Sequence, residues 1–143
     1  MERGEYTFTI IKPNALKNGH LSSILKAITN AGFRIVALKI TIINKQQAER
    51  FYRVHKERDF FDMLTTFMST GPIAVAIIKK QNAVEDYRKL IGNTDPAKAE
   101  EGTIRKLFGM SITQNAVHGS DSESNAYHES CFFFNELEIF EQL

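Results

Sequence analysis

The chain has 143 residues, a length that suits one compact domain, and we expect a single domain over residues 1–143. Its 18 Lys and Arg residues nearly balance its 17 Asp and Glu residues, so the overall charge does not indicate binding to nucleic acid or to an anionic membrane. With one cysteine there is no internal disulfide, and no apolar run approaches the ~20 residues that span a bilayer. The sequence therefore predicts a soluble cytoplasmic protein in which Cys131 is a buried, inert thiol.

The first part of the chain predicts a strand, a helix and a second strand. The run 6–11 alternates like a half-buried strand and ends at Lys12, before a proline that cannot continue the ladder. Apolar residues at helical spacing predict a helix over 21–28, which Gly32 ends. A second strand is predicted over 34–43. The side chains expected to share one face of it are Val36, Leu38, Ile40 and Ile42.

Two helices are expected next. Asn44 and Gln47 have the spacing of a capping box, which predicts a helix that begins there. Tyr52 and His55 fall on the apolar side of that helix and are interpreted as packing residues. The run 60–69 predicts another short helix.

The second half of the chain begins with the apolar run 73–78, which has the character of a central strand. Asn82 and Glu85 predict the cap of a following helix. Residues 92–114 then lack periodicity, apart from a short turn near 103–107. Connections of this length inside a compact domain are usually functional or disordered, and the apolar residues here favour an ordered functional loop.

The chain ends with the segment 115–122, a helix expected near 122–129, and a final strand predicted over 130–134. Within that segment Ser120 and Glu123 read as a capping box. Together the elements predict an α+β protein of the ferredoxin-like class, with a four-stranded antiparallel sheet, helices on one face of it, and a long ordered loop before His118.

His118 is the first candidate for chemistry, because it leaves a short apolar run and enters a Gly-Ser-Asp turn at a helix N-terminus. An incoming phosphate is favoured there, and a neutral imidazole is available as a nucleophile near pH 7. Glu129 is the nearest carboxylate in sequence that could orient the ring. The chain has no Walker loop, no dinucleotide-binding glycine motif and no metal-cage spacing, so no protein metal site is expected.

Several cations lie near breaks in regular structure. Lys12 is at a strand end, Arg88 is near a helix end, and Arg105 and Lys106 are in the long loop. With the hydroxyl of Thr94, Arg88 and Arg105 could clamp a polyphosphate. Taken singly, each is more often a solvated charge, and Phe60 is more often a core aromatic than a ligand platform.

Six motifs in this order resemble nucleoside diphosphate kinases over nearly the whole chain, from about residue 6 to residue 134. These motifs are Ile11-Lys12-Pro13, Arg58-Asp59-Phe60-Phe61, Met68-Ser69-Thr70-Gly71-Pro72, Gly92-Asn93-Thr94-Asp95-Pro96, Gly102-Thr103-Ile104-Arg105 and Asn115-Ala116-Val117-His118-Gly119-Ser120-Asp121-Ser122. The resemblance implies a ferredoxin-like core and a ping-pong transfer of the γ-phosphoryl group from a nucleoside triphosphate to a nucleoside diphosphate, through a phosphohistidine.

The resemblance also implies roles for individual residues. His118 matches the phosphoryl acceptor, Tyr52 and Glu129 match residues that position it, and Ser120 supports that network. Phe60 matches the aromatic on which any base can stack. The residues that match phosphate contacts are Lys12, Arg88, Thr94 and Arg105, and those that match ribose contacts are Lys12 and Asn115. Mg²⁺ would arrive bridging the nucleotide phosphates, with few protein ligands.

The family pattern further implies a homo-oligomer, and Pro96 in the long loop favours a hexamer over a tetramer. Two departures from the pattern concern local turns: Asn14-Ala15 replaces the usual Asp-Gly, and Asp59 replaces a proline. Two other functions stay open at this point. One is a non-catalytic regulatory or nucleic-acid-binding module with the same fold, and the other is a phosphodonor to protein histidines that uses the same nucleophile.

Overall fold

The computed structural model describes residues 1–142. Its centre is a four-stranded sheet in the order β2-β3-β1-β4, in which every neighbouring pair is antiparallel. The strands are β1 (Tyr6–Ile11), β2 (Arg34–Thr41), β3 (Ile73–Lys79) and β4 (Val117–Gly119). This order and orientation confirm the predicted α+β, ferredoxin-like sheet.

The described part of the chain also contains seven α-helices and two short 3-10 helices, of which α7 and η2 follow the last strand. The α-helices are α1 (Pro13–Lys17), α2 (Leu21–Asn30), α3 (Lys45–Phe51), α4 (Phe61–Met68), α5 (Ala83–Ile91), α6 (Ile104–Phe108) and α7 (Glu123–Phe133). The 3-10 helices are η1 (Arg53–His55) and η2 (Glu136–Glu138). None of the helices in residues 1–142 is both long enough and apolar enough to cross a membrane.

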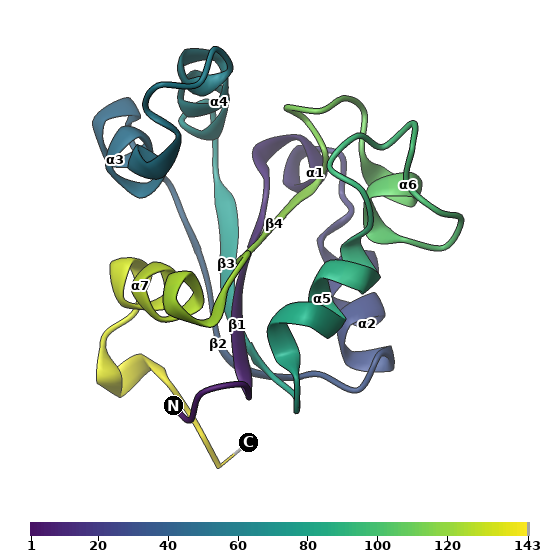
Figure 1. Ribbon diagram of the computed structural model, residues 1–143, viewed down its shortest axis with the longest axis vertical. Helices are drawn as coiled ribbons and strands as arrows, with labels where there is room; N and C mark the ends of the chain where they lie inside the picture. The colour runs from purple at the N-terminus through teal and green to yellow at the C-terminus, as the bar shows by residue number, and fades with distance from the viewer. Residues whose placement is uncertain (143) are drawn as a thin grey trace.

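The prediction that helices cover one face of the sheet is wrong, because they cover both (Figure 1). On one side α3, α4 and α7 pack over Phe8, Ile10 and Val75. On the other side α2, α5 and α6 pack over Ile11 and Ala76. Both central strands, β1 and β3, are therefore buried on both faces, and β1 is not the half-buried strand that its alternation predicted.

Strand β2 also differs from the prediction. Val36 is buried, but Leu38, Ile40 and Ile42 are 46%, 59% and 62% exposed. A register shift between Ile35 and Ala37 causes this, since one extra residue in a strand turns every later side chain to the opposite face. This edge strand and the residue after its end, Ile42, therefore present three aliphatic side chains to the surface.

Only one of the three predicted capping boxes forms. Asn44 and Gln47 bond each other's backbone N–H groups at the start of α3, as predicted. Asn82 precedes α5 in the left-handed conformation, with φ of 59°, and its side chain caps no backbone group. At α7 the cap is Ser122, which accepts from the N–H of Asn125, because Ser120 is engaged elsewhere.

The predicted final strand over 130–134 is wrong, because α7 continues to Phe133. Ala126, Ser130 and Phe133 are buried at spacings of four and three residues, which is the period of a helix. Cys131 therefore lies on the outer side of α7 and is exposed, so the prediction of a buried thiol is also wrong. Helix α1 was not predicted; Pro13 occupies its first turn, where a missing N–H costs nothing.

The loop over 92–114 is ordered around α6. Thr103 caps this helix by accepting from the N–H of Lys106, and Ile104 is fully buried. A Cβ on Gly92 would lie 2.6 Å from the hydroxyl oxygen of Thr103, so the loop closes against a position that only glycine fits. The loop thereby brings its polar residues back to the C-terminal end of β1.

Candidate active site

His118 lies on β4, directly opposite Ile10 of β1. The chain enters this strand through a γ-turn, in which the N–H of Val117 donates to the carbonyl of Asn115 at 3.0 Å. The central residue, Ala116, has a φ of 76°, a strained conformation for a residue with a Cβ. The N–H of Lys12 holds this turn by donating to the carbonyl of Ala116 at 2.8 Å. The strained residue therefore lies two positions before His118 and fixes the direction in which β4 begins.

One carboxylate oxygen organises the imidazole. Glu129 Oε1 lies 2.8 Å from His118 Nε2, and the hydroxyl of Ser120 donates to the same oxygen at 2.6 Å. A carboxylate accepts the Nε2 proton, which leaves Nδ1 as the nitrogen with the free lone pair. His118 and Glu129 are each 16% exposed, so the pair is partly shielded from water.

Aromatic rings surround His118 on the side of the sheet covered by α3 and α7. The ring centroids of Phe51 and Tyr52 lie 5.3 and 5.7 Å from that of His118, both edge-on. Burial, and then the charge of Glu129, raise the pKa of Tyr52, so its phenol stays neutral. The Tyr52 hydroxyl is buried without a hydrogen-bond partner in the described residues. It is thus a polar group free for a ligand.

Lys12 is buried at the C-terminal end of β1, with an exposure of 5%. Its Nζ donates to the carbonyl of Thr113 at 3.3 Å. Burial first, and the positive charge of Arg105 second, lower its pKa to about 7. An ammonium group held so far from its ordinary pKa is stabilised by a bound anion.

Arg105 is the second buried cation. Its two terminal nitrogens donate to the carbonyls of Gly92 and Val117, both at 3.0 Å, and these bonds join the long loop to β4. Burial is the main cause that lowers its pKa to about 10. Its Nε is buried and has no partner among residues 1–142. The guanidinium therefore holds the loop and still offers its Nε–H as a donor to a ligand.

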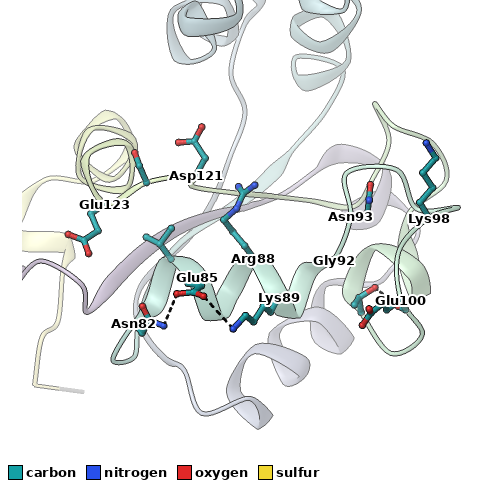
Figure 2. A pocket seen from close by; sticks show the side chains of 13 residues that line it. Asn82, Glu85, Arg88, Lys89, Gly92, Asn93, Lys98, Glu100, Asp121 and Glu123 are labelled. Carbon is teal, nitrogen blue, oxygen red and sulfur yellow. Dashed lines mark hydrogen bonds and ion pairs between the residues drawn. The ribbon is translucent and has the colours of Figure 1, made fainter.

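Arg88 and Thr94 are exposed. Arg88 extends from α5 into a surface groove that Asp121 also borders (Figure 2). Both residues also line the cavity that holds His118. Asn115 is buried, its amide donates to the carbonyl of Thr94 at 3.0 Å, and its Oδ1 has no partner in the described chain.

Most of these groups line one cavity of about 310 Å³. Nine of the ten candidate residues border it: Lys12, Tyr52, Phe60, Arg88, Thr94, Arg105, Asn115, His118 and Glu129. The tenth, Ser120, lies behind Glu129. Lys106, which the sequence also indicated, does not border the cavity. Sequence reasoning missed Ile112 and Thr113, which also line the cavity, because nothing distinguishes them from other residues of an irregular loop.

No cluster of three or more His, Cys, Asp or Glu side chains in residues 1–142 could hold a metal ion. Two carboxylates border the cavity. Glu129 is bonded to His118 and Ser120, and Asp121 accepts from the amide of Asn125 at 2.6 Å. Such a set suits a hydrated cation that arrives with its ligand better than a resident metal.

An oriented imidazole beside buried cations, at the strand ends of this sheet, suits a protein that transfers phosphoryl groups through a histidine nucleophile. Comparisons with known proteins define the class further. The family model for nucleoside diphosphate kinase matches residues 5–139. The nucleoside diphosphate kinase of Flavobacterium psychrophilum is 54% identical over 94% of this chain and 96% of its own length, and that of Geobacter sulfurreducens is 49% identical over 94% and 98%.

Solved structures agree. The chain superposes on the Aquifex aeolicus nucleoside diphosphate kinase with a TM-score of 0.92 and 41% identity, covering 94% of this chain and 98% of that one. A Halobacterium salinarum nucleoside diphosphate kinase, solved with CDP, gives a TM-score of 0.90 and 31% identity, over 95% and 91%. The chain belongs to the nucleoside diphosphate kinase family. It is an enzyme that passes the γ-phosphoryl group of a nucleoside triphosphate to a nucleoside diphosphate through a phosphohistidine, a kinase reaction that needs a divalent metal.

Proposed function

We propose that His118 is the phosphoryl acceptor of this reaction and that Nδ1 is the attacking atom. The observation that carries the proposal is the 2.8 Å contact between Nε2 and Glu129, which occupies the other ring nitrogen. The Nδ1 lone pair forms a bond to the γ-phosphorus, and the bond from phosphorus to the bridging oxygen breaks. The nucleoside diphosphate leaves with that electron pair. A second diphosphate then attacks the phosphohistidine with a terminal oxygen and restores Nδ1.

The cations around His118 stabilise the negative charge on the phosphate oxygens during the transfer. Lys12 and Arg105 converge from β1 and the long loop, and Arg88 and Thr94 close the outer side of the cavity. In a partly shielded site such donors act more strongly than in water, and they are already in place before the reaction. Glu129 stabilises the positive charge that the ring acquires as the new bond forms. Tyr52 packs against the ring and limits its rotation.

The nucleoside binds at the open end of the cavity. Phe60 is 40% exposed and offers a ring face on which any base can stack, so we propose a broad acceptance of bases. Asn115 and Lys12 would contact the ribose hydroxyls. The unpartnered Oδ1 of Asn115 supports this, since an acceptor in the cavity wall suits a hydroxyl donor.

The divalent metal of the reaction is proposed to be Mg²⁺. The residues of the cavity fit this ion, because Mg²⁺ keeps several waters and binds through phosphates with one or two carboxylates. Asp121 is the residue that would contact its hydration shell. When bound, the ion neutralises charge on the phosphates.

We propose that the chain assembles as a homo-oligomer, with a hexamer favoured over a tetramer. Leu38 and Ile40 on the edge strand β2, with Ile42 just after it, form an exposed aliphatic row, and such a row favours pairing with a second copy. Pro96 supports the hexamer. It is buried at the base of the long loop, which in a hexamer would meet the same loop of neighbouring subunits. A cytoplasmic location is proposed from the exposed thiol of Cys131, which suits a reducing compartment.

The decisive experiment is to label the protein with γ-labelled ATP and Mg²⁺. We expect a phosphoenzyme that survives alkali and is lost in acid, with the phosphoryl group on Nδ1 of His118. His118→Gln should abolish the label. His55→Gln is the matched control, because His55 borders the same cavity, and it should still be labelled. Equal labelling of His118→Gln and the parent protein would show that the nucleophile is another residue.

A further inference from the structure

The open end of the cavity has two walls that come from distant parts of the chain. One wall is the start of α4, where Phe60 is 40% exposed. The other is the tip of the long loop, where Ile112 is 58% exposed. Both residues line the cavity and are exposed, so the gap between them is one opening through which a ligand that stacks on Phe60 can enter and leave.

The two walls touch through Met63 and Thr113. The Thr113 hydroxyl donates to the Met63 sulfur at 3.3 Å, although the two residues are 50 positions apart. Met63 lies three residues after Phe60, so both side chains project from the same side of α4. Thr113 lines the cavity, whereas Met63 is 64% exposed. The contact therefore crosses the mouth on its solvent side.

The loop side of this contact is held firmly. The N–H of Met110 and the amide of Asn14 both donate to the carbonyl of Gln114, at 2.7 and 3.1 Å, so the tip is a closed turn anchored on α1. The carbonyl of Thr113 in turn accepts from Lys12. Met63 is the adaptable partner, because its side chain is unbranched and its thioether is soft and a weak acceptor.

We propose that the contact between Met63 and Thr113, here called the Met63–Thr113 strap, slows the release of bound nucleotide. The inference rests on the proposed nucleotide site. A weak sulfur acceptor lets the strap open easily for entry, and its closing behind the base lengthens the time for which the nucleotide stays. Because the strap reads no base edge, it acts on all nucleotides alike. Met63 is thus a positioning residue that keeps the base on Phe60.

The test is the dissociation rate of a fluorescent nucleoside diphosphate, measured by stopped flow on the unphosphorylated enzyme. Met63→Ala should speed dissociation on the order of tenfold, the change that a loss of about 1.4 kcal/mol produces. Met63→Leu keeps the apolar bulk but not the acceptor and should fall between parent and Met63→Ala. Thr113→Val should release the nucleotide at the same rate as Met63→Leu. The double variant, Met63→Leu with Thr113→Val, should release it no faster than either single variant, because both changes remove the same hydrogen bond.

Two further variants separate the possible failures. Met110→Leu is the matched control, since Met110 is 66% exposed on the same loop and does not line the cavity; its dissociation rate should equal the parent's. Phe60→Ala tests the site itself. An unchanged rate for Met63→Ala with a faster rate for Phe60→Ala would overturn the strap alone. Unchanged rates for both would overturn the nucleotide site as well. A Met63→Leu rate equal to the parent's would overturn the hydrogen bond to Thr113.

Discussion

Ser120 donates its hydroxyl hydrogen bond, at 2.6 Å, to the oxygen of Glu129 that also contacts His118. Ser120 is fully buried, and it therefore fixes the carboxylate from behind while the imidazole meets it from the front. The serine that the sequence presents as a helix cap acts instead as the far end of a three-residue chain that orients the nucleophile.

Breaking this chain should slow phosphorylation in a graded way. Glu129→Gln removes the charge that stabilises the ring, and hydrogen bonds to charged groups contribute ~1.5–3 kcal/mol, so the rate should fall roughly 10- to 150-fold. Ser120→Ala removes one ordinary donor and should cost about 1 kcal/mol, roughly a fivefold slower rate. Rapid-quench measurement of phosphoenzyme formation gives both values.

The control for these variants is Ser122→Ala. Ser122 caps α7, so its loss should lower the free energy of unfolding by about 1 kcal/mol without slowing phosphorylation. If Ser122→Ala slowed the reaction as much as Ser120→Ala, the effect of Ser120 would be one of stability rather than of orientation.

Lys12 should take up a proton when a nucleotide binds. Its pKa in the free protein is about 7, and bound phosphate favours the ammonium form, so at pH 8 binding should draw close to one proton from the buffer. Affinity should consequently fall as the pH rises above 7. Titration calorimetry at pH 8 in buffers of different ionisation enthalpy measures the uptake, and Lys12→Gln should remove it. Equal heats in all buffers for the parent would contradict the lowered pKa.

The same group predicts how stability depends on pH. In the unfolded chain Lys12 has its ordinary pKa of 10.5, so between pH 7 and 10.5 the unfolded state binds the extra proton. The contribution of Lys12 to the free energy of unfolding should therefore rise with pH across this window. Denaturant unfolding at pH 7 and pH 9.5 gives the free energy of unfolding of the parent and of Lys12→Gln. The difference between the two proteins at each pH is the contribution of Lys12, and it should be larger at pH 9.5.

Removing the aromatic ring of Phe60 should weaken every nucleotide. Base stacking on an aromatic side chain contributes roughly 1–3 kcal/mol, so Phe60→Ala should raise the Kd of ADP, GDP, CDP and UDP by about 5- to 150-fold, with purines losing more because their faces are larger. Calorimetry gives the four values. A preference of several orders of magnitude for one base in the parent would reveal a residue that reads base edges.

Most of the site could be predicted because its residues occupy short segments of unusual composition. His118 precedes a Gly-Ser-Asp turn, and Lys12 precedes a strand-ending proline. What the local pattern could not show depends on contacts between distant segments. The local pattern presents Ser120 only as a helix cap, and its place in the His118 network came from the family resemblance, because the contact with Glu129 forms only when α7 turns back. The Met63–Thr113 strap likewise joins helix α4 to the long loop, which no local pattern connects.

The errors in the fold have a similar cause. A run of five residues that includes several apolar ones reads alike as strand or helix. The sequence therefore predicts a strand over 130–134, although burial at Ala126, Ser130 and Phe133 follows a helical period. A bulge in β2 reversed the side-chain pattern after Ile35, and strand periodicity alone cannot show where an extra residue falls.

Pro96 should control assembly through its contact with Gly109. A Cβ on Gly109 would lie 2.6 Å from the Pro96 ring, so the two residues pack closely and close the base of the long loop. Pro96→Ser should loosen this closure and raise the flexibility of the unfolded chain, which lowers the thermal midpoint and shifts the oligomer toward smaller species at low protein concentration. At high concentration the site should stay intact, and phosphoenzyme formation should match the parent's.

Ala97→Ser, which adds the same hydroxyl at the exposed neighbouring position, is the control and should leave both the thermal midpoint and the oligomeric state unchanged. Light scattering combined with thermal unfolding across a concentration series gives the result, and a monomer mass for the parent at micromolar concentration would refute the proposed assembly.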